Sequence, residues 1–346
     1  MNWKITFQAA ATYIGAIMGA GFASGQEIQQ FFVNFGRWGF LGIILSAALF
    51  SVLGWIMLDL QSKWRVNSYS DFFKKLIGEK WGSRVDFFIS ILLLVGLIAM
   101  LSGSGALFNQ YVGLSSWIGV LLTIGVIILA LWFKGEGVLW INTVLIPLKF
   151  IFCLGIAVLA IFYGLQGDGE GVVSTTTNPL IKNWMISSIL YVSFNLTFAL
   201  VVFASLGKEI QKPGANRGAV FGGMLLGLFA GVIGGALISF PEVKTFEIPM
   251  VAVAGKLGEW PAFFYVLVLW FAMITAAVGN AFSLVTRIVN KNKVNDHVVT
   301  LLLLLLVFPL AGVKFSVIVK VLYPLLAYMG LILLPIIFSK WIKQKN

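Results

Sequence analysis

Apolar stretches of about 20 residues recur along the whole chain, separated by short polar clusters. Each stretch is long enough to cross roughly 30 Å of hydrocarbon as an α-helix. The composition agrees with this interpretation, because 60% of the 346 residues are hydrophobic and only 11% are charged, too few to cover a soluble domain. We therefore predict an all-α membrane protein that forms a single transmembrane domain over residues 1–346.

The apolar stretches predict ten transmembrane helices. Their expected ranges are 5–33, 37–60, 83–112, 115–133, 137–164, 182–207, 216–240, 260–289, 296–312 and 315–339. Two further helices are expected not to cross the membrane. The helix over 68–78 is expected to lie on the membrane surface, because its apolar residues recur at helical spacing, and the other is expected over 248–257, before the eighth span.

The net charge of +11 does not point to a nucleic acid as partner. Positive residues accumulate on the cytoplasmic loops of membrane proteins. With the N-terminus inside, seventeen of the 24 lysines and arginines fall on the cytoplasmic side and five on the other. An even number of spans then places both termini in the cytoplasm. We expect a multi-pass protein of a bacterial inner membrane that contacts the lipid bilayer, and the sequence leaves its oligomeric state open.

The first span contains a segment that disfavours a continuous helix, Met18 to Glu27 (MGAGFASGQE). Each glycine in it lowers helix propensity by about 1 kcal/mol relative to alanine. Polar and ionisable side chains follow directly, and non-helical backbone at membrane depth is tolerated where it lines a cavity or is buried in protein. A break here would free N–H groups for an anion and carbonyl groups for a cation. The alternative is that the glycines only let another helix pack closely.

The sixth span carries a weaker version of this pattern. Ser193, Asn195 and Thr197 occupy alternate positions, which cannot share one helix face, so an unwound segment is expected. The alternative is that the three groups bond back to their own helix or to neighbouring helices. Breaks five spans apart indicate an inverted five-plus-five repeat, over approximately 5–164 and 182–339, with a site at the membrane midplane.

Other intramembrane polar residues leave two interpretations open. Lys149 in the fifth span is either functional, because a buried charge is expensive, or extends to the cytoplasmic interface. Thr275 in the eighth span either supplies a ligand oxygen or bonds between helices. Span seven carries a glycine at every fourth position, a pattern typical of a close-packing surface: Gly223, Gly227, Gly231 and Gly235.

The sequence has no zinc-protease, nucleotide-binding or clustered Cys/His motif, so we expect neither an enzyme nor a cofactor. Its energy source would be an ion gradient or the gradient of the substrate itself.

These residues resemble the amino acid/polyamine/organocation (APC) superfamily with its LeuT-type fold, and within it the uncharacterised YkvI-like bacterial membrane proteins. The segment 19–22 (GAGF) is similar to the G-[SA]-G-[IF] segment of that superfamily, and the resemblance implies that its backbone N–H groups bind a substrate carboxylate. Segment 208–213 (KEIQKP) is similar to an E-E-V-x-x-P loop. Segment 142–149 (NTVLIPLK) is similar to a fifth-span segment that ends in a lysine in proton-coupled members.

The chain departs from the family in two places. The usual Gly-Phe-Glu of the sixth span is absent, and the eighth span keeps Thr275 but has Ala276 where sodium-coupled relatives have a second hydroxyl. The resemblance then implies that the Lys149 ammonium occupies the place of sodium and that a proton is the coupling ion. The alternative is sodium, bound by Thr275 with the backbone of Ala16 and Gly19.

We therefore expect a secondary active transporter of a small amino acid or a related zwitterion or amine, working by alternating access. The predicted substrate-binding residues are Gly19, Ala20, Gly21, Phe22, Ser24, Gly25, Glu27, Ser193, Asn195 and Thr197, and the predicted ion-coupling residues are Lys149 and Thr275. Glu27 is a substrate-amine partner, a second proton carrier or an external gate residue. The alternative functions are a sodium-coupled symporter and a ligand-sensing membrane subunit that transports nothing.

Overall fold

The computed structural model describes residues 3–66, 69–132, 136–164, 178–206, 214–292 and 294–344. These residues form helices and no β-strand, which confirms the all-α class. The longer helices are α1 (Trp3–Ile17), α4 (Arg37–Trp64), α6 (Glu79–Leu107), α7 (Ser116–Trp132), α8 (Glu136–Gly164), α9 (Trp184–Leu206), α10 (Ala215–Ser239), α12 (Glu259–Asn292) and α13 (Asp296–Val307). The shorter ones are α2 (Ala20–Ala23), α3 (Gln26–Phe31), α5 (Tyr69–Ile77), α11 (Pro249–Leu257), α14 (Phe315–Val317), α15 (Tyr323–Leu331) and α16 (Leu333–Lys343).

Short 3₁₀ and π-helical turns extend or join these helices. The 3₁₀ turns are η1 (Val33–Phe35), η4 (Pro241–Thr245) and η5 (Pro309–Gly312), and the π turns are η2 (Phe108–Val112) and η6 (Ile318–Leu322). The last apolar segment is therefore built from several pieces rather than one regular helix.

Five helical segments are long and apolar enough to cross a membrane: Arg37–Trp64, Glu79–Val112, Ala215–Ser239, Glu259–Val289 and Phe315–Lys343. Four shorter apolar helices accompany them: Ser116–Trp132, Leu148–Gly164, Trp184–Leu200 and Asp296–Gly312. Each of these segments overlaps one of the expected spans, and α1, α2 and α3 together occupy the remaining one. The chain is an all-α membrane protein, and ten complete crossings remain a prediction.

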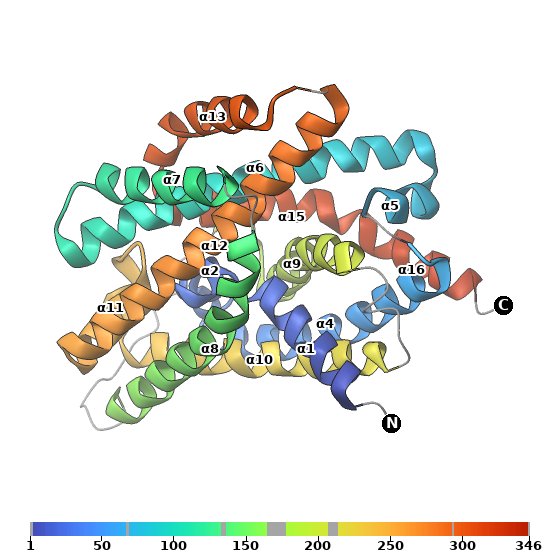
Figure 1. Ribbon diagram of the computed structural model, residues 1–346. Coiled ribbons are helices and arrows are strands. Elements are labelled where there is room, and N and C mark those ends of the chain that lie inside the picture. The colour runs from blue at the N-terminus through green and yellow to red at the C-terminus, as the bar shows by residue number, and fades with distance from the viewer. Residues whose placement is uncertain are drawn as a thin grey trace.

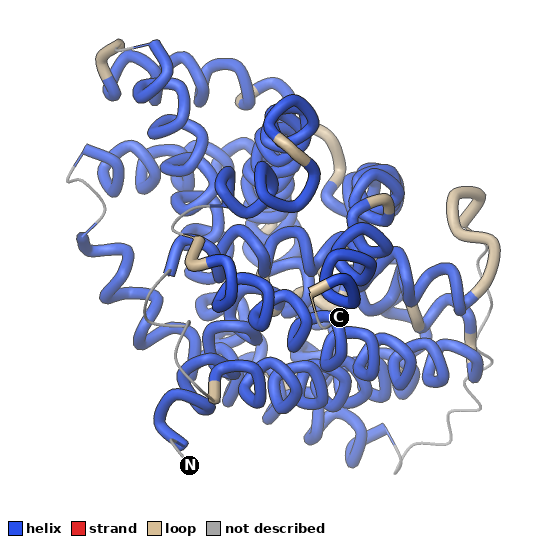
Figure 2. Tube along the Cα trace, turned by 90° about the vertical axis from the view of Figure 1, so that its right-hand side faces the viewer, coloured by secondary structure: helices blue, strands red, loops and turns tan. Residues whose placement is uncertain are grey.

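The helices form two groups that face one another. α4 packs lengthwise against α10, and α1 lies against both α10 and α9. In the second group α6 packs against α7 and α12, and α13 contacts α12 and α7. α8 contacts both α10 and α12 and so joins the groups. Figure 1 shows α6, α7 and α13 along one edge of the molecule and α1, α4 and α10 along the other. A view turned by 90° shows helices joined by mostly short connections (Figure 2).

The two expected short helices are present as α5 and α11. The apolar face of α5 does not lie on the bilayer, however, because Phe72, Phe73 and Leu76 are fully buried. Phe72 packs on Trp64 at the end of α4, with ring centroids 5.3 Å apart. The helical spacing of apolar residues therefore predicted the helix, and the tertiary structure decided that protein rather than lipid covers it.

The prediction of a break in the sixth span was wrong. α9 is helical without interruption over Trp184–Leu206. The Asn195 side-chain N–H and the Thr197 hydroxyl each donate to the carbonyl one turn earlier in α9, at 3.0 and 2.9 Å. The Ser193 hydroxyl donates to the carbonyl oxygen of Ala327 in α15, at 2.8 Å. Because these polar groups are satisfied within the helix or across to a neighbour, their spacing does not require an unwound backbone.

The glycine stripe of α10 is a close-packing surface, as predicted. A methyl group on Gly223 would lie 2.4 Å from the backbone nitrogen of Ser51, and one on Gly227 would lie 2.3 Å from the Cβ of Ala47, so α4 and α10 touch along this line. A methyl on Gly231 would meet open space. The contact between α4 and α10 therefore depends on part of the stripe.

Candidate functional site

The first apolar segment is interrupted twice, at 18–19 and at 24–25. α1 ends at Ile17, Gly19 is extended, and α2 occupies the next four residues. Gly25 then has φ +81°, a left-handed conformation that glycine adopts without a steric penalty, and α3 follows. The Ser24 hydroxyl donates to the Gly21 carbonyl at 2.7 Å and accepts from the Gln26 N–H at 3.2 Å. The predicted break is confirmed.

Three other helices bind the carbonyl groups around the break. The Lys149 ammonium, from α8, donates to the carbonyl of Met18. The Tyr265 hydroxyl, from α12, donates to the carbonyl of Ala23 at 2.6 Å. The N–H of Met250, in α11, donates to the carbonyl of Ser24 at 3.0 Å. Each bond satisfies a buried carbonyl that the interrupted helix leaves without its usual partner.

Lys149 lies in the protein interior and does not extend to the interface. Only 7% of the residue is exposed, and its ammonium bonds to the end of α1. The resemblance implied a place near the carbonyls of the break, and the contact with Met18 agrees with this expectation. Lys320, by contrast, is exposed on η6.

Glu27 is the second ionisable side chain in this region and is 5% exposed. Its Oε2 accepts a long hydrogen bond from the Tyr191 hydroxyl, at 3.4 Å. The carboxyl also lies against Gly21, since a methyl group there would come within 2.0 Å of Oε1. Among the residues that the structure describes, no lysine or arginine forms an ion pair with Glu27. A buried carboxyl group without a cationic partner is a candidate ligand-binding group.

Aromatic rings surround the Tyr191 partner of Glu27. Its ring centroid lies 5.2 Å from that of Phe31, 4.9 Å from that of Phe32 and 5.9 Å from that of Phe50. Because these rings fix Tyr191, its hydroxyl is held at the carboxyl group. Tyr191 and Tyr265 are site residues that the sequence analysis missed, although a tyrosine with a polar tip deep in an apolar span is a usable signal.

The predicted polar side chains of the sixth and eighth spans have their hydrogen-bond partners outside the break. The hydroxyls of Ser193 and Thr197 face α15, where a methyl on Gly330 would lie 2.8 and 3.0 Å from them. The Thr275 hydroxyl donates to the carbonyl of Ala272 in its own helix, at 3.1 Å. The sixth span reaches the site through Tyr191 instead. Segment 208–213, which resembles a family loop, lies outside the described residues.

Buried amide side chains lie before and after Glu27 in the sequence, in α3 and η1. Gln26, Gln29 and Asn34 are at most 6% exposed, and the side-chain oxygen of each has no hydrogen-bond partner among the described residues. The Gln29 side-chain N–H donates to the carbonyl of Lys244 in η4, at 2.8 Å. Buried acceptors without a donor are costly, so this side of α3 is a polar surface that is covered in this conformation.

The segment from η4 to α11 provides that cover. Besides its bonds to α3 and to the break, it is attached to η2, where Gln110 exchanges two hydrogen bonds of 3.0 Å with the backbone of Ile248. It is also attached to the last apolar segment, since the Glu247 carboxylate accepts from the N–H and the hydroxyl of Ser316 at 2.8 and 2.9 Å. Hydrogen bonds therefore attach this cover to three apolar segments, the first, the third and the last.

Comparison with known proteins finds similar sequences in Bacillus subtilis, one of them named as a membrane protein. No family model matches the chain. It is 27% identical to the uncharacterized membrane protein YkvI of Bacillus subtilis (strain 168), over 94% of this chain and 92% of that protein. It is 29% identical to the uncharacterized protein YyaD of the same organism, over 99% of this chain and 100% of that one. The resemblance to YkvI-like proteins is supported at this level, and membership of the APC superfamily remains a prediction.

Solved structures with a similar backbone include a variant of the manganese transporter of Eremococcus coleocola. The match covers 97% of this chain and 86% of that one, with 12% identity and a TM-score of 0.49.

Proposed function

We propose that the protein is a secondary active transporter of a small amino acid or a related zwitterion or amine, and that substrate binds at the break in the first apolar segment. One observation carries the proposal: two buried ionisable side chains, Glu27 and Lys149, lie at an interruption of a membrane helix. Such groups are expensive in a membrane and mark substrate or ion pathways. Broken helices near the midplane are typical binding sites of secondary transporters.

The proposed architecture is a LeuT-type inverted repeat of five plus five spans, over approximately 5–164 and 182–339. The grouping of helices supports it, because the first two spans of one half pack against the first two of the other: α1 and α4 each contact both α9 and α10. The second half lacks a break equivalent to that in the first, so the two halves are not equivalent at the site. The excess of basic residues on one set of loops supports a bacterial inner-membrane location with both termini in the cytoplasm.

For substrate recognition, we propose that Glu27 binds the substrate ammonium group. Its carboxyl has no cationic partner in the described part of the chain and lies beside α2 at Gly21. A zwitterion suits this arrangement, because its ammonium and carboxylate are close together. The substrate ammonium would bind Glu27. The substrate carboxylate would bind the backbone N–H groups of segment 19–22, the role that the family resemblance implies for this segment.

For coupling, we propose a proton carried by Lys149. Its ammonium donates to the end of α1, so loss of the proton would remove the positive charge, weaken this charge-assisted hydrogen bond and favour movement of α1 relative to α8. A sodium ion would need the Thr275 hydroxyl and the carbonyls of Ala16 and Gly19. The Gly19 carbonyl already accepts from the N–H of Ala23 at 3.1 Å, and Thr275 bonds within its own helix. These bonds favour the proton over sodium.

The experiment is uptake and counterflow of labelled amino acids and amines in proteoliposomes that contain the purified protein. Wild type should accumulate at least one substrate when a pH gradient is imposed. Lys149→Gln should still exchange substrate but lose the response to the gradient. Lys320→Gln, which changes an exposed lysine of another helix, is the matched control and should behave as wild type.

Three results would contradict parts of this proposal. Retained pH-gradient dependence in Lys149→Gln would remove that lysine from coupling. Stimulation by a sodium gradient alone would favour the sodium alternative. Saturable binding of a ligand without any exchange across the membrane would favour a ligand-sensing subunit.

A further inference from the structure

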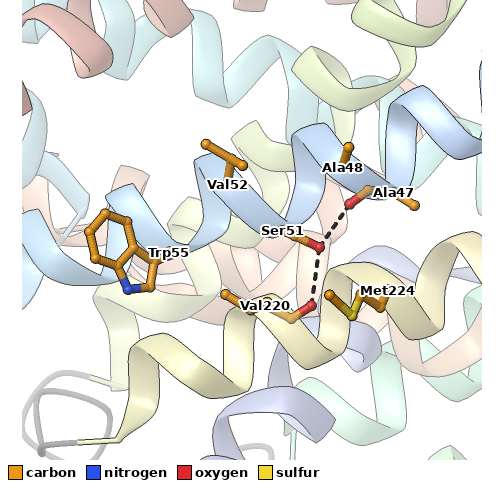
Figure 3. Close-up of a pocket in the computed structure, with 7 residues that line it drawn as sticks. All are labelled: Ala47, Ala48, Ser51, Val52, Trp55, Val220 and Met224. Atoms are coloured by element: carbon orange, nitrogen blue, oxygen red, sulfur yellow. Dashed lines mark hydrogen bonds between the residues drawn. The ribbon is translucent and has the colours of Figure 1, made fainter.

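The surface between α4 and α10 contains a groove of about 690 Å³ (Figure 3). It lies on the outer surface of the helix bundle, where Val52 and Met224 on its walls are 52% and 57% exposed. Its floor is made of the small residues Ala47, Ala48 and Ser51 of α4. The exposed apolar walls indicate that the groove opens to the hydrocarbon of the bilayer.

The groove is apolar because its polar group is already satisfied. The hydroxyl of Ser51 lies 2.8 Å from the carbonyl oxygen of Ala47 and 3.1 Å from that of Val220, and it bonds within this pair of helices (Figure 3). It offers no free donor to a ligand. The occupant must therefore be hydrocarbon where it lies along the floor.

A positive charge stands at one end of the groove. Arg217 precedes Val220 by three residues and Met224 by seven, so helical spacing places all three on one face of α10. Arg217 is exposed in the first turn of α10, and no carboxylate of the described residues forms an ion pair with it.

The other groups at this end are typical of a membrane interface. Trp55 and Trp341 pack edge to face with ring centroids 5.3 Å apart, in the manner of an interfacial aromatic belt. Asp59, the acidic residue one turn beyond Trp55, is already bound by the Lys63 ammonium at 2.8 Å and by the Trp341 ring N–H at 2.9 Å. The net charge available to a ligand at this end is therefore positive.

We propose that the groove binds an anionic phospholipid, with one acyl chain along the floor of small residues and the phosphate at Arg217. A guanidinium group binds phosphate through paired charge-assisted hydrogen bonds, and basic positions between membrane helices at the interface bind anionic headgroups. The proposal depends on the membrane location of the protein and not on the transported substrate.

The test uses the full chain purified in a neutral detergent, with phosphatidylglycerol or phosphatidylcholine of the same acyl chains added. Bound lipids are counted by native mass spectrometry across a lipid titration. Wild type should bind phosphatidylglycerol more tightly. Arg217→Gln should reduce this preference about fivefold, because one basic residue at a membrane surface contributes this much to anionic lipid binding. Arg84→Gln is the control, since Arg84 is exposed on α6 and stacks on Trp81, 4.3 Å from its ring centroid.

A second variant tests the groove itself. Ala48→Trp fills the floor from the outer surface and should weaken binding of both lipids, and Val52→Trp gives the same test if the first variant does not fold. Unchanged lipid preference in Arg217→Gln would overturn the proposal. So would a dimer of wild type that Ala48→Trp converts to a monomer without any change in lipid binding, because the groove would then be an interface between two copies.

Discussion

Replacement of Gly21 by alanine tests the position of the Glu27 carboxyl, on which the proposed binding site depends. The added methyl carbon would lie 2.0 Å from Oε1, 2.9 Å from Cδ and 3.2 Å from Cγ of Glu27. The helix cannot accept it unless the carboxyl group moves. The expected result is a loss of stability that depends on the presence of Glu27.

The size of this effect follows from the contact. Adding a methyl group to a filled interior lowers the free energy of unfolding by about 1–3 kcal/mol. Alanine in place of glycine in a helix raises it by about 1 kcal/mol. In a Glu27→Ala background the obstructing atoms are absent, so only the favourable contribution of alanine remains. The free energies of unfolding of the two single variants and the double variant should therefore be non-additive by about 1–3 kcal/mol.

The measurement is reversible unfolding of wild type, Gly21→Ala, Glu27→Ala and the double variant in mixed detergent micelles. Gly231→Ala is the matched control, because a methyl there meets nothing within 4 Å, and it should be additive with Glu27→Ala. If the double variant at Gly21 and Glu27 is also additive within about 0.5 kcal/mol, the carboxyl does not lie on Gly21 and the reasoning is refuted.

Three further predictions concern the packing around the break and between α4 and α10. Gly25→Ala should lower the free energy of unfolding by about 2–4 kcal/mol, because φ +81° disfavours alanine and the methyl would lie 2.7 Å from an α11 side chain. Gly255→Ala is the control, because a methyl there meets open space, and it should not lower the free energy of unfolding. Equal losses in the two variants would contradict this account. Tyr265→Phe leaves the carbonyl of Ala23 without its donor and should cost about 1–3 kcal/mol in the same unfolding assay, whereas no change would mean that another group binds this carbonyl. Gly223→Leu should abolish the monodisperse peak in size-exclusion chromatography, because even a methyl there meets the α4 backbone, and a normal elution profile would show that the helices can separate.

The sequence predicted those features that depend on local chemistry. Long apolar runs predicted the helical class, because only a helix satisfies its own backbone groups in hydrocarbon. The run of three glycines and polar residues after Ile17 predicted the first break, because glycine lowers helix propensity wherever it occurs. The short helix α11, before the eighth apolar run, was also predicted.

The sequence could not decide how polar side chains within a span are satisfied. Ser193, Asn195 and Thr197 have the same spacing whether they line an unwound segment or bond to neighbouring carbonyls. An intact helix offers a carbonyl one turn back to each side chain, and this local bond has no signature in the sequence. The predicted second break was wrong for this reason.

The tertiary structure alone assembled the candidate site. Lys149 is 131 residues from its acceptor Met18, and Tyr191 is 164 residues from Glu27. Periodicity within one helix indicates which face is apolar, but not which helix covers that face. Which helix covers a given face is decided by the packing of whole helices, such as that of α4 on α10 along their small residues. Only the packed bundle brings side chains that are distant in the sequence within hydrogen-bond distance.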